Sequence, residues 1–247
     1  MADALTILGL NKKFDQQAVL SEVSFNVNEG EFFGLVGLNG AGKSTLIKCL
    51  LDFCSIESGT IRIFGKDHTD ITSRSRIAYL PERFTPPYYL TGRDFLVLMS
   101  ELHNHRYDET EVSRLLNILD LEKSALSKPV YKFSKGMGQK LGLLSCLVSG
   151  KNLLVFDEPM SGLDPRAMSF LKKHLLTLRQ EGYTLFFSTH ILVDIEALCD
   201  RMAILHKGKI RYTGSPAQCK EHFNSSNLEQ AFVRCVDTPV ENFKSAV

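Results

Sequence analysis

The sequence predicts an α/β fold with a mostly parallel sheet, and three observations support this prediction. Short apolar runs of strand length alternate along the chain with runs that have helical periodicity. A glycine-rich stretch, GLNGAGKST at residues 37–45, lies between one such apolar run and one such helical run. Two later apolar runs end in polar residues, as expected of strands buried on both faces of a parallel sheet. In such folds the ligand lies at the carboxyl ends of the strands.

The composition agrees with a large globular fold. The chain has 247 residues, 44% of them hydrophobic, which is enough for one large domain or a domain with a subdomain. Its 29 Lys and Arg nearly balance 28 Asp and Glu, so charge gives no reason to expect nucleic acid. No apolar run approaches the roughly 20 residues that span a bilayer, and the N-terminus does not resemble a signal peptide. Six scattered cysteines without a C-x-x-C pattern favour buried free thiols over a disulfide or zinc site.

The first third of the chain is expected to consist of strands around the glycine-rich stretch. Residues 4–10 and 23–27 are predicted to be short strands, with residues 11–22 as turn and strand edge between them. Residues 31–36 are predicted to be the strand that enters the stretch, and residues 44–53 the helix that leaves it. Two further strands are expected in SGTIRIFGKD and RIAYLPE.

The middle of the chain, at about residues 83–150, is expected to be a helical insertion between strands. It opens with a proline-rich loop over residues 81–92. Two amphipathic patterns follow, TGRDFLVLMSELH and DETEVSRLLNILDL, and a third helix is predicted to begin near Ser134. Asp108 with Glu111 resembles a capping box at the start of the second pattern.

The last part of the chain returns to alternating strands and helices. NLLVFDEP and YTLFFSTH are predicted to be buried strands, and a helix between them is expected from Pro165 to just before Gly182. After a helix in ILVDIEALCD, RMAILHKGKIRYTG is expected to form a hairpin that turns at Lys207 and Gly208. The residues from Ser215 onward are polar and weakly periodic, and they are predicted to be peripheral.

The glycine-rich stretch matches the Gly-x4-Gly-Lys-Ser/Thr pattern of a phosphate-binding loop. Glycines let backbone N–H groups point at phosphate oxygens without an obstructing Cβ, and the following helix N-terminus adds partial positive charge. Lys43 is placed to reach the β- and γ-phosphates, and the Ser44 hydroxyl to ligate Mg²⁺. A chance glycine turn is the alternative, which the flanking strand and helix disfavour. The expected nucleotide contacts are Gly37, Asn39, Gly40, Ala41, Gly42, Lys43, Ser44 and Thr45.

Polar residues at other predicted strand ends extend this nucleotide site. Asp157 can hold Mg²⁺ opposite Ser44, and the adjacent Glu158 can orient and polarise an attacking water. Two acids after a strand could also form an ordinary turn, but the phosphate loop upstream favours the metal and base roles. His190 could contact the γ-phosphate, although alone it would be assigned as a surface histidine. Phe14 could stack on a base or anchor the small N-terminal sheet, and its position alone leaves both open.

These motifs together resemble the ATP-binding cassette (ABC) ATPases over nearly the whole chain. FSKGMGQKLGLL at residues 133–144 is similar to the family signature written LSGGQ. Ser134 and Gly136 match its serine and second glycine, whereas Phe133, Lys135 and Met137 differ.

Further motifs carry the same resemblance. MSGLDP resembles the family's D-loop, with Asp164 as its acid, and STH resembles the switch region, with His190 as its histidine. Phe14 falls where the family has its base-stacking aromatic, which favours the stacking role. The proline-rich loop falls at the family's Q-loop, where Glu82 replaces the usual glutamine. A carboxylate there can still ligate Mg²⁺ or its water, but it adds negative charge near the γ-phosphate.

The resemblance implies a P-loop NTPase fold. A RecA-like, mostly parallel sheet would carry a small antiparallel β subdomain and an inserted α-helical subdomain. The expected division is a single ABC ATPase domain over residues 1–220, with core and β subdomain in 1–82 and 151–214, a helical subdomain in 83–150, and a peripheral extension in 215–247.

The resemblance also implies a mechanism that needs two chains. In this family two cassettes pair head to tail, with ATP between the phosphate loop of one and the signature of the other. Ser134 and the amide of Gly136 would therefore act on the γ-phosphate held by a second copy. The resemblance assigns catalytic roles to Glu158, His190 and Lys43, and Mg²⁺ ligation to Ser44, Asp157 and Glu82.

The function implied is that of an ATPase subunit of a membrane transporter. YLPE and the SKGM form of the signature resemble the cassettes of bacterial export systems whose membrane subunits are separate chains. The expected partners are such a permease and a second copy, and the expected location is cytoplasmic, peripheral on the inner face of the cell membrane. The alternative is a soluble ABC ATPase acting on ribosomes or nucleic acid, which usually has two cassettes, a coiled-coil insertion or a basic tail. A regulator without hydrolysis is disfavoured by Asp157, Glu158 and His190.

Overall fold

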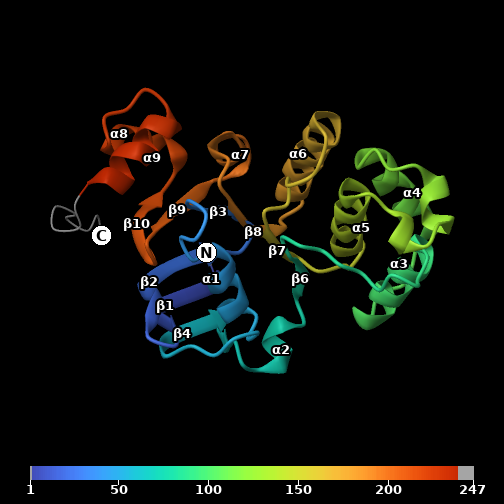
Figure 1. The fold of residues 1–247 in the computed structure, drawn as a ribbon, viewed down its shortest axis with the longest axis horizontal. Coiled ribbons are helices and arrows are strands. Elements are labelled where there is room, and N and C mark those ends of the chain that lie inside the picture. The colour runs from blue at the N-terminus through green and yellow to red at the C-terminus, as the bar shows by residue number, and fades with distance from the viewer. Residues whose placement is uncertain (1, 239–247) are drawn as a thin grey trace. The chain divides into compact units, whose positions relative to one another are not determined.

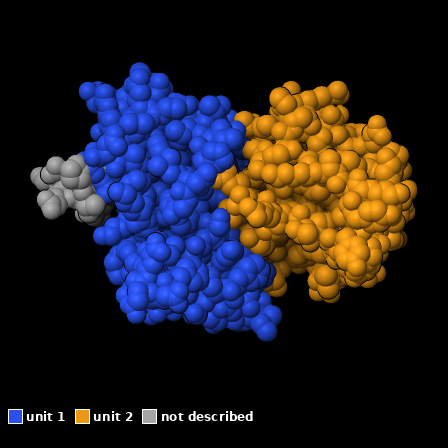
Figure 2. All heavy atoms as spheres, viewed as in Figure 1, with its two compact units in different colours: residues 1–74, 184–247 blue, residues 75–183 orange. Residues whose placement is uncertain are grey.

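The computed structural model describes residues 2–238, and the chain folds into two units that Figure 2 colours separately. Unit 1 combines residues 1–74 with residues 184–247, and unit 2 is the intervening segment, residues 75–183. Strands and helices alternate through both units, so the predicted α/β class is confirmed.

An antiparallel sheet forms from the first strands of unit 1, in the order β2-β1-β4-β5 (Figure 1). Its first two strands form one long hairpin that turns at Asp15, where φ is +50°. The prediction of turn and strand edge over residues 11–22 is therefore wrong in extent. Backbone pairing continues through this polar segment, and Lys12 is buried opposite Leu20. The bounds are β1 Asp3–Phe14, β2 Gln17–Asn28, β4 Ser58–Ile63 and β5 Lys66–Asp67.

A second set of strands in unit 1 has the order β10-β9-β3-β8 and is mainly parallel. Every residue of β3 and β8 is buried, which agrees with the prediction of strands covered on both faces. The predicted hairpin turn is confirmed, because Lys207 and Gly208 both have positive φ angles between β9 and β10. The bounds are β3 Phe32–Val36, β8 Thr184–Thr189, β9 Arg201–His206 and β10 Lys209–Gly214.

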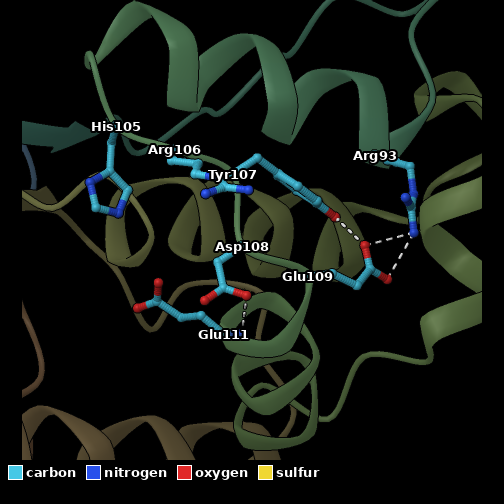
Figure 3. Close-up of a pocket in the computed structure, with 7 residues that line it drawn as sticks. All are labelled: Arg93, His105, Arg106, Tyr107, Asp108, Glu109 and Glu111. Atoms are coloured by element: carbon cyan, nitrogen blue, oxygen red, sulfur yellow. Dashed lines mark hydrogen bonds and ion pairs between the residues drawn. The ribbon is translucent and has the colours of Figure 1, made fainter.

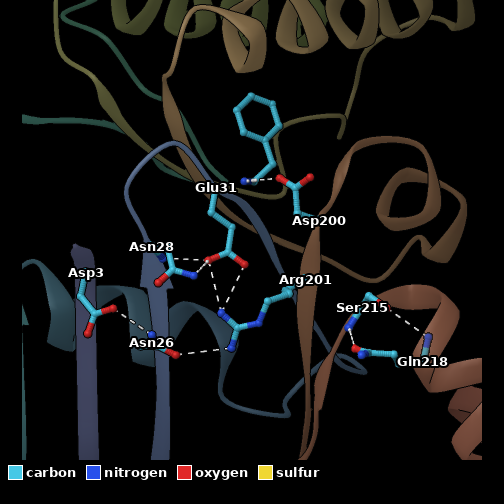
Figure 4. Close-up of polar contacts among 9 residues, drawn as sticks. Asp3, Asn26, Asn28, Glu31, Asp200, Arg201, Ser215 and Gln218 are labelled. Carbon is cyan, nitrogen blue, oxygen red and sulfur yellow. Dashed lines mark hydrogen bonds and ion pairs between the residues drawn. The ribbon is translucent and has the colours of Figure 1, made fainter. Parts of the chain in front are cut away.

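Polar contacts hold the start of β3, as Figure 4 shows. The Glu31 carboxylate is buried and accepts from the backbone N–H of Asn28 at 2.7 Å and from the Arg201 guanidinium at 3.3 Å. The Asp200 carboxylate accepts the N–H of Phe32 at 2.9 Å. A buried carboxylate is costly unless it is paired, so these contacts fix where β3 begins beside β9.

The C-terminal helices correct one prediction. The residues after Ser215 form two capped helices beside β10, whereas the sequence suggested weak periodicity (Figure 1). One face of the second helix is buried at i, i+3, i+4 and i+7, a helical spacing hidden among polar neighbours. Residues 239–247 of the predicted extension lie outside the described residues. The helices are α8 Pro216–His222 and α9 Leu228–Asp237, and the buried face consists of Leu228, Ala231, Phe232 and Cys235.

The other helices of unit 1 follow its strands or pack against them. The predicted helix after the glycine-rich stretch is confirmed as α1, Lys43–Leu50. A short helix, α2, covers Ile71–Arg74, and α7, Leu192–Leu198, packs on β3 and β8 with Ile195 fully buried.

Unit 2 contains two parallel strands and the helical insertion predicted between them. Thr91 and Asp94 form a capping box at the start of α3. Asp108 caps α4 by accepting the N–H groups of Thr110 and Glu111, so the predicted cap is present. The full capping box, in which both side chains accept from the backbone, is the one at α3. The bounds are β6 Ile77–Leu80, α3 Gly92–Leu102, α4 Glu109–Ile118, 3-10 turns at Lys123–Ser127 and Val130–Lys132, α5 Lys135–Leu147, β7 Leu153–Asp157 and α6 Pro165–Gln180.

Two expectations from composition can be compared with the structure. All six cysteines are free thiols, and Cys54 alone among the six is more than slightly exposed. Within residues 2–238, no helix combines the length and the apolar character that crossing a membrane requires.

Candidate active site

The phosphate loop of unit 1 joins the buried strand β3 to helix α1. Gly42 ends the loop with φ +110°, a region that residues with a Cβ rarely adopt. A Cβ at this position would also lie 2.9 Å from Leu20 Cδ2 and 3.1 Å from the Val19 carbonyl oxygen, both on β2. The loop therefore requires glycine here for its backbone and for its packing against β2.

The N-terminus of α1 is open to an anion. Its N-cap residue is Gly42, which has no side chain to accept the first N–H groups, and the first turn has no acidic residue. Those N–H groups need an acceptor, and the helix dipole favours a negatively charged one. Six other helices in the described part of the chain have an N-cap side chain that accepts such an N–H, whereas α7, like α1, has none. The six caps are Thr91, Asp108, Ser134, Asp164, Ser215 and Asn227.

Lys43 brings its positive charge back over the same loop. Its ammonium donates to the Gly37 carbonyl oxygen at 2.8 Å and to that of Leu38 at 3.5 Å, and the side chain is buried. A cation beside the uncapped N-terminus of a helix matches the charge and the acceptor geometry of phosphate oxygens. Residues 38–40 at the tip of the loop, including Asn39 and Gly40, are exposed.

Strand register brings His190 to the same sheet edge as the loop. β3 and β8 run parallel with Val36 opposite Thr189, so Gly37 and His190 each follow directly from aligned strand ends. His190 is exposed. The predicted proximity of the switch histidine and the phosphate loop is thus built into unit 1.

Phe14 ends β1 on the hairpin that touches the loop. In this hairpin Lys12 pairs with Leu20, the residue whose side chain approaches Gly42. The Phe14 ring is 47% exposed, and the Lys12 ammonium lies 4.9 Å from its centre. Because the ring is half exposed, it is available for stacking and does not fill a core.

Unit 2 carries the predicted carboxylates at the ends of its two strands. Asp157 ends β7 and is buried, and its charge adds to burial in raising the pKa of Tyr79 on β6 to about 12. Leu80 lies opposite Phe156, so Glu82 follows its strand at nearly the level where Asp157 ends β7. Glu82 itself is exposed.

Glu158 is buried and has a left-handed backbone, with φ +51°. A non-glycine residue in this region carries conformational strain, and strain of this kind concentrates at functional sites. The turn is closed by the N–H of Ser161, which donates to the Glu158 carbonyl oxygen at 3.0 Å.

No group of three or more His, Cys, Asp or Glu side chains in residues 2–238 is arranged to hold a metal ion. Magnesium in nucleotide sites typically takes one or two protein oxygens together with phosphate oxygens and water. The half-buried hydroxyl of Ser44 and the buried carboxylate of Asp157 are oxygen donors of the required kind.

The signature residues begin helix α5. Ser134 is its N-cap and accepts the N–H of Met137 at 3.2 Å, which leaves its own hydroxyl hydrogen to donate outward. Gly136 lies in the first turn, where a Cβ would come within 2.8 Å of the Gly162 carbonyl oxygen. Glycine at this position is therefore also required for packing against the predicted D-loop.

The sequence reasoning missed a contact that ties the D-loop to this helix. Lys140 is buried on α5 and donates to the Asp164 carboxylate at 3.0 Å and to the Asp120 carbonyl oxygen at 3.0 Å. The N–H of Ala167 first, and Lys140 second, hold the pKa of Asp164 below its usual value. A lysine on the buried side of an apolar helix was the available signal, because such a charge needs a partner.

A polar hollow in unit 2 contains none of the predicted site residues (Figure 3). Its acids and bases largely pair with each other. Glu109 accepts from Arg93 at 2.7 Å, from Tyr107 at 3.0 Å and from Lys123 at 3.1 Å. This network links the start of α4 to α3 and is structural in character.

Comparison with known proteins first defines the class of fold. A solved structure described as the ATP-binding subunit of an ABC transporter superposes with a TM-score of 0.86 at 33% identity, covering 94% of this chain and 99% of that one. The fold is therefore that of an α/β P-loop NTPase, as the sequence predicted.

The chain belongs to the ABC transporter family, whose family model matches residues 20–161, more than half of its length. An uncharacterized ABC transporter ATP-binding protein of Synechocystis sp. is 38% identical over 85% of this chain, which spans 59% of that relative's length. The Nod factor export ATP-binding protein I of Mesorhizobium japonicum is 33% identical over 92% of this chain and 68% of the relative.

Replacing Gly42 with Ala should weaken phosphate binding by the loop. An alanine is strained at φ +110°, and its methyl group would collide with Leu20 and Val19. The backbone of the loop must therefore move, and its N–H groups lose their anion-binding arrangement. We expect at least a tenfold loss of nucleoside triphosphate affinity, measured by isothermal titration calorimetry. Gly65→Ala is the matched control, because Gly65 also has positive φ but its Cβ would meet nothing within 4 Å. Equal affinity losses in the two variants would contradict the special role of Gly42.

Proposed function

We propose that this chain is the ATP-hydrolysing subunit of an ABC transporter, working with a separate membrane subunit, and that the transport is export. The observation that carries the proposal is the phosphate loop of unit 1. An uncapped helix N-terminus, a glycine with φ +110° and a buried lysine over the loop carbonyls form a polyphosphate site.

The loop residues are proposed to hold the phosphates of ATP. The N–H groups of Gly40 and Gly42 and of the first turn of α1, which begins at Lys43, would donate to phosphate oxygens. The N–H of Ala41, which donates to the Leu38 carbonyl oxygen at 3.1 Å, would exchange this acceptor for a phosphate oxygen. The Lys43 ammonium would exchange its loop carbonyl for the β- and γ-phosphate oxygens. The other loop contacts are those predicted for Gly37, Asn39, Ser44 and Thr45, and the half-exposed ring of Phe14 would stack on the adenine.

Mg²⁺ is proposed as the cofactor, with the Ser44 hydroxyl and the Asp157 carboxylate as protein ligands. Glu82 is a further proposed ligand, directly or through water. When bound, the ion would neutralise phosphate charge in the transition state. All three side chains offer hard oxygen donors, which Mg²⁺ prefers.

Glu158 is proposed to accept a proton from the water that attacks the γ-phosphate. Its side chain is buried and its backbone has a strained left-handed conformation, and both favour a functional role over that of an ordinary turn residue. His190, at the end of the strand beside β3, would contact the same γ-phosphate.

A second copy of the chain is proposed to complete each site. Ser134 uses its oxygen to cap α5, so its hydroxyl hydrogen can donate to a γ-phosphate held by the partner copy. The amide of Gly136 lies in the first turn of that helix, where N–H groups lack an intrahelical acceptor. Two copies arranged head to tail would thus place two ATP molecules between them.

Transport is proposed from the relatives, one of which is named for Nod factor export. The permease would be a separate chain and would select the substrate, and this chain would lie on the cytoplasmic face of the membrane. We also propose the predicted division of the chain: a core with a β subdomain, a helical subdomain at residues 83–150, and a peripheral extension at residues 215–247.

Replacing Glu158 with Gln should separate ATP binding from turnover. The amide keeps the shape of the side chain but cannot accept the proton, so we expect a fall of at least 100-fold in phosphate release with ATP affinity unchanged. The variant should also accumulate as an ATP-dependent dimer in size-exclusion chromatography. Glu181→Gln, at the exposed C-terminal end of α6, is the matched control and should keep the parent rate. Turnover by Glu158→Gln at the parent rate would show that another group is the base.

The transporter role predicts a membrane partner. The neighbouring reading frames should include one that encodes a multi-span membrane protein without its own cassette. Co-expressed with such a protein, the chain should be retained with it through affinity purification in detergent. ATP turnover by the purified complex should then respond to the transported substrate. Sedimentation of the chain with ribosomes, and not with membranes, would contradict the proposal and favour the soluble alternative.

A further inference from the structure

The turn that ends α1 brings two cysteines into contact. Asp52 has φ +60°, and its N–H donates to the Cys49 carbonyl oxygen at 3.1 Å, while the Phe53 N–H donates to the Lys48 carbonyl oxygen at 2.8 Å. This pair of hydrogen bonds is a Schellman ending, which reverses the chain past the last helical turn. The residue that follows, Cys54, is therefore directed back toward the side of the helix that it has just left.

The two sulfur atoms lie within contact distance. Cys49 is on the last turn of α1, and its Sγ is 3.6 Å from the Sγ of Cys54. A disulfide bond is about 2.0 Å long, so the sulfurs need to approach by roughly 1.6 Å. Because Cys54 lies in an exposed turn next to the exposed Phe53, a small movement of this segment can supply the approach without disturbing the buried helix.

The two thiols differ in their access to an oxidant. Cys49 is fully buried, whereas Cys54 is partly exposed. Burial first, and the neighbouring Cys54 second, raise the pKa of Cys49 to about 12, with Lys12 acting in the opposite direction. Cys54 is thus the thiol that a dissolved oxidant meets first, and Cys49 is protected until its neighbour has reacted.

We propose that Cys49 and Cys54 form a redox-active dithiol that hydrogen peroxide converts to an intrachain disulfide. In the first step the Cys54 sulfur attacks one peroxide oxygen, the O–O bond breaks, and Cys54 becomes a sulfenic acid with release of one water. The Cys49 sulfur then attacks the Cys54 sulfur, the S–O bond breaks, and the hydroxyl group leaves with the Cys49 proton as a second water. The dithiol loses two electrons, and one peroxide is reduced to two waters.

This modification site is distinct from the proposed nucleotide contacts but lies on the same helix. Lys43 and Ser44 occupy the first turn of α1, and Cys49 occupies its last turn. The disulfide would close a ring of six residues around the Schellman ending.

Peptide mass spectrometry on the full-length chain tests the proposal directly. The protein is treated with hydrogen peroxide, quenched in acid, unfolded, alkylated with iodoacetamide and digested with trypsin without reductant. Cleavage after Lys48 and Arg62 places both cysteines on one peptide, CLLDFCSIESGTIR. We expect this peptide to be unalkylated and lighter by two hydrogen atoms than its dithiol form, and dithiothreitol should restore two alkylatable thiols.

Internal and variant controls make the result specific. Cys219 and Cys235 are buried in α8 and α9 and should remain alkylated at peroxide concentrations that oxidise most of the peptide. Cys54→Ser should leave Cys49 as a thiol, and Cys49→Ser should stop Cys54 at a sulfenic acid that dimedone traps.

Three results would overturn the proposal. All three concern the parent protein. The first is a Cys54 sulfinic acid in a peptide whose Cys49 is alkylated. The second is oxidation of the peptide no faster than that of Cys219 and Cys235, and the third is an oxidised peptide that dithiothreitol does not reduce. The parent measurement needs no substitution, so a folding defect in either variant does not affect the decision.

Discussion

The proposed activity depends on a row of backbone N–H groups at the start of α1, where the N-cap residue has no side chain to accept them. Six other helices of the described chain begin with a serine, threonine, aspartate or asparagine cap, whereas α1 begins with Gly42. An aspartate or glutamate in this first turn would neutralise the helix dipole and repel phosphate. The stability that a cap would add, typically ~1 kcal/mol, is absent at this position, and a bound anion can restore it.

The surrounding structure positions this helix end. β3 is buried along its length and begins at a carboxylate pair, Glu31 and Asp200, which accept hydrogen bonds from Arg201 and from the Phe32 backbone. β8 ends in register with β3, so His190 leaves the sheet beside the loop. Leu20 on β2 packs where only a glycine at position 42 leaves room. In unit 2, the buried Lys140 similarly ties the signature helix to the half-exposed Asp164, so one ion pair orders two motifs.

Most of the fold could be predicted from sequence because glycine spacing and apolar strands are local features of the chain, and the same features carry the prediction of the site. The buried strands ending at Val36, Asp157 and Thr189 were recognisable from short apolar runs followed by polar residues. The length of the β1–β2 hairpin was not, because a polar segment remained extended through backbone pairing, which has no side-chain signature. α9 was missed since its four buried positions are separated by charged and polar residues. The Cys49–Cys54 contact depends on the left-handed backbone conformation of Asp52, which the sequence alone does not predict.

The proposed activity requires two chains, because a phosphate loop from one copy and Ser134 from another form one working site. Mixing two inactive variants tests this most directly. Lys43→Ala lacks the phosphate-binding cation, and Ser134→Asp keeps an N-cap acceptor for α5 but puts a carboxylate where a hydroxyl donor should face phosphate. Each variant alone should be inactive, whereas an equimolar mixture should regain about a quarter of the parent ATP turnover. About half of the randomly formed pairs are then mixed, and each mixed pair has one intact site out of two. A mixture that stays as inactive as its components, although the chains exchange, would contradict the claim.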